Sequence, residues 1–264
     1  MWANSGLGVV TLPDFWQTLH GDQLTVARDQ IETIQGNNIV LKSGNDFVTD
    51  FVVMCTGWGD HFGMFSSDDK TTIGLPLYGS AAPSKNHCSS INWDVYDTFA
   101  EEVVNKKLPF LTKPPDVLYK SRLDSSNQNH WRLYRRAIPI ELADKGDRSI
   151  VILGQIHTVQ TPLVAAVQSF WAILYLLGEL SIPDKETMAT EASLWNAWTR
   201  KRYLGQGIKQ PYSLYDFLPY VDTLFGDLKL NSRRKSNPIS EMLSPYKPED
   251  FAGFIEEYIS SERS

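Results

Sequence analysis

The longest apolar run of the chain, Leu163–Leu177, constrains the fold more than any other segment. It follows Thr161-Pro162, a pair typical of the first turn of an α-helix, and it is interrupted by Gln168 and Ser169. A helix that spans a bilayer needs about 20 consecutive apolar residues, so this run is too short and too polar to cross a membrane. We therefore predict a helix at 161–177 that is buried in the core of a globular protein.

The composition of the chain argues against two classes of partner. The 264 residues carry a formal net charge of −6, whereas proteins that bind nucleic acid or an anionic membrane need a basic surface. Hydrophobic residues make up 42% of the chain and charged residues 21%, as in ordinary globular proteins with a substantial core. We expect neither nucleic acid nor a membrane span, and a small molecule is the expected partner.

The cysteines and the N-terminal residues bear on the cellular compartment. Cys55 and Cys88 are too few for a disulfide framework and lack the spacing of a zinc or redox site, so we interpret them as buried apolar side chains. Residues 1–5 have neither the basic nor the apolar stretch of a secretory signal. These features predict a cytoplasmic protein. No cluster of His, Cys, Asp and Glu has the spacing of metal ligands, so no metal is expected.

The first quarter of the chain has the pattern of a small β-meander behind one short helix. Phe47–Thr56, rich in Val and Phe, is predicted to be a buried strand, and Gly44-Asn45 marks the turn before it. The other elements expected here are a helix at 13–20 and β-prone stretches at 24–28, 31–34 and 38–42.

The rest of the chain is predicted to be mainly helical. Residues 59–90 are rich in Gly, Ser, Pro and Asp and are expected to form a loop. A helix follows at Asn92–Lys107, with Val95, Phe99 and Val103 on one apolar face. The further elements expected are strands at 133–142 and 149–153 around a turn at 144–147, helices at 185–203, 213–224 and 249–259, and a polar segment at 231–245.

No segment has the glycine pattern of a dinucleotide site, which places a glycine turn directly between a strand and a helix. Gly6-Leu7-Gly8 has no room for a strand before it and has Thr11 in place of the third glycine. Gly57-Trp58-Gly59 follows a strand but has Phe62 at the third position, and Gly205-Gln206-Gly207 has the character of a helix end. From these residues alone we expect no nucleotide cofactor.

Two stretches nevertheless resemble flavin-containing monooxygenases of natural-product pathways. Asp50–Trp58, with the sequence DFVVMCTGW, is similar to the strand and TGW segment that closes the NADPH-binding domain of that family. Downstream, this chain resembles the strand pair and the last helix of the FAD domain at Leu133–Arg136, Ile150–Ile156 and Pro162–Leu176. It resembles the C-terminal ends of such proteins at Tyr215–Leu224 and Pro245–Tyr258. The resemblance extends over residues 13 to 260.

This resemblance implies an α/β fold of mixed α+β character: a truncated remnant of the two-domain, Rossmann-like FAD/NAD(P)-binding monooxygenase fold with a helical C-terminal part. In that family both dinucleotide fingerprints lie upstream of the matching part. We expect residues 1–264 to form a single compact unit, with 13–58 as the meander remnant of the NADPH domain and 59–264 as the remnant of the FAD domain plus C-terminal helices. Strands such as Phe47–Thr56 and Ser149–Leu153 are apolar on both faces, so we expect a second copy to cover them in a dimer.

The resemblance also locates a candidate site. In that family the loop before the last FAD-domain helix lies against the flavin, and here that loop is 154–161. His157 is the candidate acid/base residue, and a histidine satisfied within a loop is the competing interpretation. The other loop residues expected to contact a substrate, beside the positive end of a helix, are Gln155, Thr158, Gln160 and Thr161.

Further candidates lie outside this loop. Asp60 and His61 form a second acid/base pair unless these adjacent side chains point apart. Arg135 and Arg136 are placed on a strand, where alternation puts Arg135 opposite its neighbours; one of these arginines either faces a cavity and binds an oxyanion, with Arg135 as the candidate, or contributes surface charge. Four aromatic residues either line an apolar substrate cavity between the TGW segment and the loop or belong to the core: Trp58, Trp93, Trp131 and Tyr134.

Three functions are compatible with these features. The first is a cofactor-independent cyclase or isomerase acting on a hydrophobic natural-product intermediate, in which shape and hydrogen bonds polarise the substrate. The second is the C-terminal half of a monooxygenase that uses FAD and NADPH with a companion segment. The third is a non-catalytic binding protein. A visible absorption spectrum separates the second function from the other two.

Overall fold

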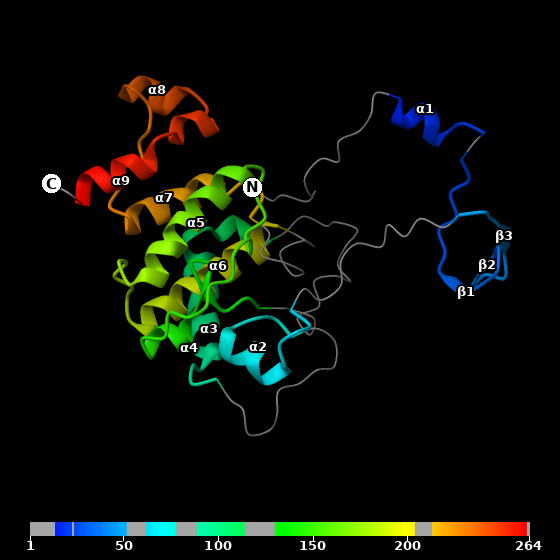
Figure 1. The fold of residues 1–264 in the computed structure, drawn as a ribbon, viewed down its shortest axis with the longest axis horizontal. Helices are drawn as coiled ribbons and strands as arrows, with labels where there is room; N and C mark the ends of the chain where they lie inside the picture. Colours follow the sequence, from blue (N-terminus) through cyan, green and yellow to red (C-terminus); the bar gives the residue numbers. More distant parts are fainter. Residues whose placement is uncertain are drawn as a thin grey trace. The chain divides into compact units, whose positions relative to one another are not determined.

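The structure is a computed structural model that describes residues 14–22, 24–51, 62–77, 89–113, 130–203 and 213–262. The described residues divide into two compact units, 14–51 and 62–262 (Figure 1). The first unit covers the predicted meander, and the second covers the segment predicted to be the FAD-domain remnant with its C-terminal helices. Helices with small antiparallel sheets are compatible with the mixed class predicted from the sequence. Within the described ranges, no helix combines the length and apolarity needed to cross a membrane.

The first unit is a three-stranded antiparallel meander preceded by a short helix. After α1 (Phe15–Leu19), β1 (Ile31–Gln35) pairs with β2 (Asn38–Leu41), which pairs with β3 (Asp46–Val48). The β1–β2 turn begins at Gly36, whose φ of 58° suits the first position of a two-residue hairpin turn. The helix and the strands near 31 and 38 were predicted, whereas residues 24–28 form no strand.

The prediction of a long buried strand at Phe47–Thr56 is wrong for its described part. β3 ends at Val48, and Val48 and Phe51 are 82% and 86% exposed. Residues 52–56, with Cys55, and also Cys88 lie outside the described ranges. Apolar composition favoured burial, but a meander of three short strands is too small to form a core of its own. The expected dimer stays a prediction.

The second unit is built around α5 (Thr161–Leu177) (Figure 1). Val167, Trp171 and Tyr175 repeat every four residues along α5, and each is at most 1% exposed. The core that contains them includes side chains of α6 (Lys185–Arg202) and α7 (Phe217–Asp227). This arrangement confirms the buried helix predicted from the apolar run.

The other described helices of this unit are α2 (Ser67–Ile73), α3 (Trp93–Lys107), α4 (Ile140–Asp144), α8 (Pro238–Leu243) and α9 (Phe254–Glu262), with 3₁₀ turns η1 (Pro109–Thr112) and η4 (Pro248–Phe251).

Helix α3 lies where it was predicted but buries a different face. Val95 and Phe99, expected on the buried face, are 60% and 49% exposed. The buried positions are Ala100 and Val104, which pack with Ala197 of α6. Two alanines bring the backbones of α3 and α6 close together, and this close approach decides the orientation of α3 over the larger apolar side chains.

The predicted strand at 133–142 is a tight hairpin followed by a helix. β4 (Leu133–Tyr134) pairs with β5 (Ile138–Pro139), and α4 begins at the next residue. Arg135 and Arg136 lie in the three-residue turn with φ of 51° and 54°, a left-handed conformation that favours glycine. The prediction that Arg135 lies on a strand is therefore wrong.

Several element boundaries also differ from the prediction. Residues 149–153 are extended but form no strand; Ile152 donates its N–H to the Ala137 carbonyl of the hairpin at 2.8 Å and packs with Leu133. Helix α2 forms inside the predicted loop 59–90, and α8 forms inside the predicted polar segment. Helix α7 begins at Phe217, later than predicted, and the predicted helix 249–259 is divided into η4 and α9.

Candidate functional site

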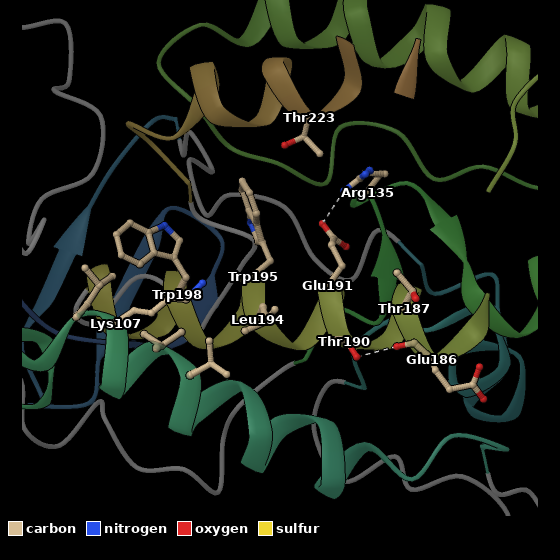
Figure 2. A pocket seen from close by; sticks show the side chains of 13 residues that line it. Lys107, Arg135, Glu186, Thr187, Thr190, Glu191, Leu194, Trp195, Trp198 and Thr223 are labelled. Carbon is tan, nitrogen blue, oxygen red and sulfur yellow. Dashed lines mark hydrogen bonds and ion pairs between the residues drawn. The ribbon is translucent and has the colours of Figure 1, made fainter. Parts of the chain in front are cut away.

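A cavity of about 680 Å³ lies along α6, between α3, the hairpin turn and α7 (Figure 2). We refer to it as the α6 cavity. Its lining residues come from α6 at intervals of three or four positions, which places them on one face of the helix. They are Glu186, Thr187, Thr190, Glu191, Leu194, Trp195 and Trp198, joined by Val103, Val104, Lys107 and Leu108 of the α3 end, Arg135 of the hairpin and Thr223 of α7.

Hydrogen bonds to the indole N–H groups fix the positions of the two cavity tryptophans, Trp195 and Trp198. The indole N–H of Trp195 donates to the Ser213 hydroxyl at 3.1 Å. The indole N–H of Trp198 donates to Oδ2 of Asp216 at 3.0 Å. Because both polar atoms already have partners, the rings contribute apolar surface to the cavity, and their positions are fixed by these bonds.

The other end of the cavity is charged. Arg135 donates from Nε and Nη2 to the two carboxylate oxygens of Asp227, with both distances 2.8 Å. Its remaining nitrogen, Nη1, lies 3.6 Å from Oε1 of Glu191 (Figure 2). Trp171 of the core also donates to Asp227, at 3.0 Å. Burial alone would lower the pKa of Arg135, but its bonds to Asp227 and the charges of Glu191 and Asp227 raise that pKa, so the guanidinium stays charged.

Arg136, next to Arg135 in the turn, is buried as well. It is 2% exposed and donates from Nη1 to Oδ1 of Asn196 at 2.9 Å, while its Nε and Nη2 atoms have no hydrogen-bond partner among the described residues. Burial lowers its pKa to about 10, partly offset by the charge of Glu191. Burial also raises the pKa of Glu191, and Arg135 and Arg136 oppose that rise. Together with Asp227, these side chains form a charge-balanced cluster.

A buried chain of hydrogen bonds connects this cluster to the segment that precedes α5. Gln168 of α5 accepts from the Gly154 N–H at 3.0 Å and donates to the Tyr220 hydroxyl at 2.6 Å. Tyr220 in turn donates to the carbonyl of Arg135 at 2.7 Å. The polar residue that interrupts the apolar run at 168 therefore holds the hairpin turn, α5 and the 154–161 segment together.

The predicted loop 154–161 leads into α5 as expected, but its side chains do not converge on one point. His157 is exposed, and its backbone carbonyl accepts from the N–H of Ser213 at 3.1 Å. Thr158 is 1% exposed, and its hydroxyl has no partner among the described residues. The side chain of Gln155 donates to the Leu153 carbonyl at 3.3 Å. Gln160 immediately precedes α5, and the Thr161 hydroxyl donates to the carbonyl of Thr158 at 2.9 Å.

The predicted aromatic residues lie in separate places. Trp131, 4% exposed, packs in a second core cluster around Leu133 and Ile152, in line with the interpretation that it is a core residue. The guanidinium carbon of Arg132 lies 4.3 Å from the centre of the Trp93 ring, and both residues line a smaller cavity. Tyr134 is buried, and the guanidinium carbon of Arg135 lies 4.6 Å from the centre of its ring. Trp58, Asp60 and His61 lie outside the described residues.

Of the predicted residues that the structure describes, therefore, only Arg135 lines the α6 cavity. The residues predicted from the sequence to form a site did not include Glu191, Trp195 and Trp198. Their spacing of four and three positions within the predicted helix 185–203 placed them on one face, together with Leu194. The same face also carries Glu186, Thr187 and Thr190, so a helix face that changes from acidic and hydroxyl side chains to aromatic ones is the signal that identifies this cavity.

Comparisons with known proteins show similarity along the whole chain. No family model matches it, and no solved structure matches it significantly. It is 39% identical over 264 residues to an FAD-dependent monooxygenase of Fusarium langsethiae, covering 99% of this chain and 44% of that protein. FAD-dependent monooxygenases of Alternaria brassicicola and Aspergillus sclerotiorum are 38% and 34% identical, covering 97% and 100% of this chain. The chain spans less than half the length of these relatives.

These relatives support the resemblance to monooxygenases and are consistent with a match to one portion of such an enzyme. They also correct the expectation that no nucleotide cofactor is involved, because their names specify FAD. That expectation relied on the missing glycine turns, a criterion that is informative only for the segment that contains the phosphate site. None of these names indicates a cyclase or an isomerase.

The described residues do not by themselves fit the dinucleotide part of FAD. That fit requires a strand, a glycine turn and a helix N-terminus in direct succession. Among the described glycines with positive φ, Gly154 precedes α5 by seven positions, and Gly253, which directly precedes α9, follows a 3₁₀ turn and no strand. The orphaned hydroxyl of Thr158 near the N-terminus of α5 is one polar atom and not a phosphate cradle.

Proposed function

We propose that this chain is part of an FAD-dependent monooxygenase acting on a small apolar molecule. The observation that carries the proposal is the similarity of 97–100% of the chain to enzymes named FAD-dependent monooxygenases, at 34–39% identity. The function replaces the cofactor-independent cyclase or isomerase, which has no support from these relatives. The α6 cavity supports the substrate class, since its volume suits a small organic molecule.

In this proposal the phosphate groups of FAD are bound by the portion of the enzyme that this chain does not match. The support is that the relatives are more than twice as long as the chain, and that the described residues contain no phosphate cradle. FAD, when bound, supplies the chemistry that activates molecular oxygen. The described residues supply the helical body, and in particular the α6 cavity with its charged end.

The segment 154–161 does not line the α6 cavity, so we propose it as a second contact, with the reacting end of the molecule beside the flavin, where the family resemblance places this loop. Its support is the resemblance given above, the N-terminus of the 17-residue helix α5 and the buried, unpartnered Thr158 hydroxyl. His157 remains a proposed acid/base residue because its side chain is exposed at this position. Substitution of Thr158 by Val removes the hydroxyl and keeps the shape of the side chain, and His157→Ala removes the proposed acid/base group.

The function is tested by a graft in which this chain replaces the matching segment of the Fusarium langsethiae monooxygenase. The graft is expected to consume oxygen in a reaction that depends on FAD and NADPH, the two cofactors that the family resemblance implies. The relative itself is the positive control. A graft that folds, as judged by its circular dichroism and melting curve, and consumes no oxygen above the level of free FAD contradicts the proposal and favours a non-catalytic binding protein.

A further inference from the structure

The outward face of α5 carries no charged side chain along its whole length. Its exposed and half-exposed positions recur every three or four residues, so they form one stripe on the surface of the helix. A solvated helix face is normally polar or charged, whereas a helix that is apolar all round is typically covered on every side. We refer to these positions as the α5 stripe: Ala165, Ala166, Ser169, Ile173, Leu176 and Leu177.

The C-terminal half of the α5 stripe presents large apolar side chains. Ile173, Leu176 and Leu177 are 53%, 46% and 68% exposed. Every other described helix of six or more residues carries at least one Asp, Glu, Lys or Arg, so α5 differs from its neighbours. Removal of aliphatic surface from water is the main driving force of protein association, and the stripe therefore favours a partner surface.

An apolar hollow of about 320 Å³ adjoins the N-terminal half of the stripe. Pro162 and Ala166 of α5 line it on one side, and η4, α9 and the residues between them line it on the other. Among its described lining residues only Glu256 is charged. The small side chains at this end of α5 allow the backbone of a partner to approach closely, and the hollow provides space for an apolar side chain from that partner.

The lengths of the relatives indicate which surface covers the stripe. The chain matches them over 97–100% of its own length but over only 43–45% of theirs. In such an enzyme more than half of the protein is therefore joined covalently to the body that α5 organises. A covalently joined portion meets the stripe at an effective concentration on the order of millimolar, which favours it over a second copy of the chain.

We propose that the α5 stripe docks against an uncharged, apolar surface of the flavin-binding portion of the enzyme. The segment 154–161 leads directly into α5, so this docking also fixes that segment relative to the flavin. The inference rests on the proposed function, because it takes the partner to be the remainder of an FAD-dependent monooxygenase.

The test compares two lysine substitutions in two proteins, the isolated chain and the graft in the Fusarium langsethiae monooxygenase. Ile173→Lys places a charge on the stripe. Phe99→Lys is the matched control, because Phe99 lies on the exposed face of α3 and is 49% exposed, against 53% for Ile173. In the isolated chain both positions are solvated, so each variant should change the melting temperature by no more than about 2 °C.

In the graft only Ile173→Lys is expected to have a large effect, because a lysine at an apolar interface loses its hydration without gaining a counter-charge. The Ile173→Lys graft should melt well below the Phe99→Lys graft. Its flavin-to-protein ratio should fall at least about threefold, because a displaced partner portion no longer completes the flavin site. Ile173→Leu keeps the stripe apolar and should retain the full flavin content.

The inference is overturned if the Ile173→Lys and Phe99→Lys grafts have the same melting temperature and flavin content. It is also overturned if Ile173→Lys destabilises the isolated chain as much as the graft, since the chain itself then covers the stripe. An isolated chain that dimerises, and that Ile173→Lys converts to a monomer in light scattering, shows that a second copy covers the stripe and overturns it as well. A folded, unaltered graft without flavin contradicts the proposed function instead, and the melting temperatures of its two lysine variants still test the docking.

Discussion

Arg135 and Asp227 are joined by two parallel hydrogen bonds of 2.8 Å, although they are far apart in the sequence. Asp227 is the last residue of α7, where a negative charge is disfavoured by the helix dipole. The guanidinium of Arg135 compensates that charge, and the pair fixes the hairpin turn against the end of α7. One end of the α6 cavity is therefore positioned by an ion pair between two distant elements.

Removal of one member of this pair is expected to destabilise the chain strongly. The side chains of Arg135 and Asp227 are 15% and 19% exposed, so Asp227→Asn leaves a largely buried cation whose remaining carboxylate, Glu191, is 3.6 Å away and outside normal hydrogen-bond distance. We predict a loss of about 3 kcal/mol in the free energy of unfolding, measured by urea denaturation. Asp144→Asn, which breaks the more exposed pair with Lys185, is the control and should leave stability nearly unchanged. Equal losses in the two variants would contradict this assignment.

The connection after α2 depends on a glycine. Gly74 has a φ of 82°, and an added Cβ would lie 2.6 Å from the carbonyl oxygen of Arg132. We expect Gly74→Ala to lower the melting temperature much more than Gly178→Ala, because Gly178 has a similar φ of 84° with nothing within 4 Å of an added Cβ. The comparison separates the clash from the backbone strain that the two sites share. Similar melting temperatures for the two variants would show that the close approach of Arg132 is absent in solution.

Asp97 of α3 is expected to make stability depend on acidity. Burial tends to raise its pKa, but hydrogen bonds and charge from Arg132, with a further bond from Ser193, hold the pKa below its usual value of 3.8. A lowered pKa in the folded state means that the stabilisation is present above pH 3.8 and is lost as the pH falls through the lower, folded value.

The variant Asp97→Asn should therefore be less stable than the unaltered chain at neutral pH and should lose less stability on acidification. Thermal unfolding recorded over a series of acidic buffers measures this difference. The control Asp94→Asn changes an exposed carboxylate on the same helix and should leave the acid slope close to that of the unaltered chain. An acid slope in Asp97→Asn equal to that of the unaltered chain would refute the role of the pair with Arg132.

Gln168 and Tyr220 should act as one unit in stability. Gln168 is 1% exposed and donates to Tyr220 at 2.6 Å, so Gln168→Met leaves a buried hydroxyl without this partner. We expect a loss of about 1–3 kcal/mol in the free energy of unfolding. Gln155→Met, which removes a weaker bond to the Leu153 carbonyl, is the control. In a double-mutant cycle with Tyr220→Phe the losses should not add, and strict additivity would show that the bond contributes nothing.

Much of the helical framework could be predicted from the sequence. The apolar run at 163–177 and the Thr-Pro pair before it located α5 correctly, and helix α6 was placed within one residue of its observed end. The missed helix α2 had a readable signal, because Ser66 and Asp69 form a capping box at its start. Local signals of this kind depend on neighbouring residues, so they can be identified in the sequence.

The features that failed depend on contacts between distant segments. The orientation of α3 is determined by the fit of Ala100 against Ala197, which no periodicity within α3 shows. The hairpin turn at Arg135 requires a left-handed backbone in two consecutive arginines, which the network of Asp227, Glu191 and Tyr220 stabilises. The α6 cavity was missed for the same reason, since its charged end is assembled from three separate elements.

Participation of this chain in an FAD-dependent enzyme is tested by the flavin content of the graft in the Fusarium langsethiae relative. The graft is purified without added cofactor, and its visible flavin absorption is compared with its protein concentration and with that of the unaltered relative. We expect a flavin-to-protein ratio equal to that of the relative. A folded graft that carries no flavin, and takes up none from added FAD, would contradict it.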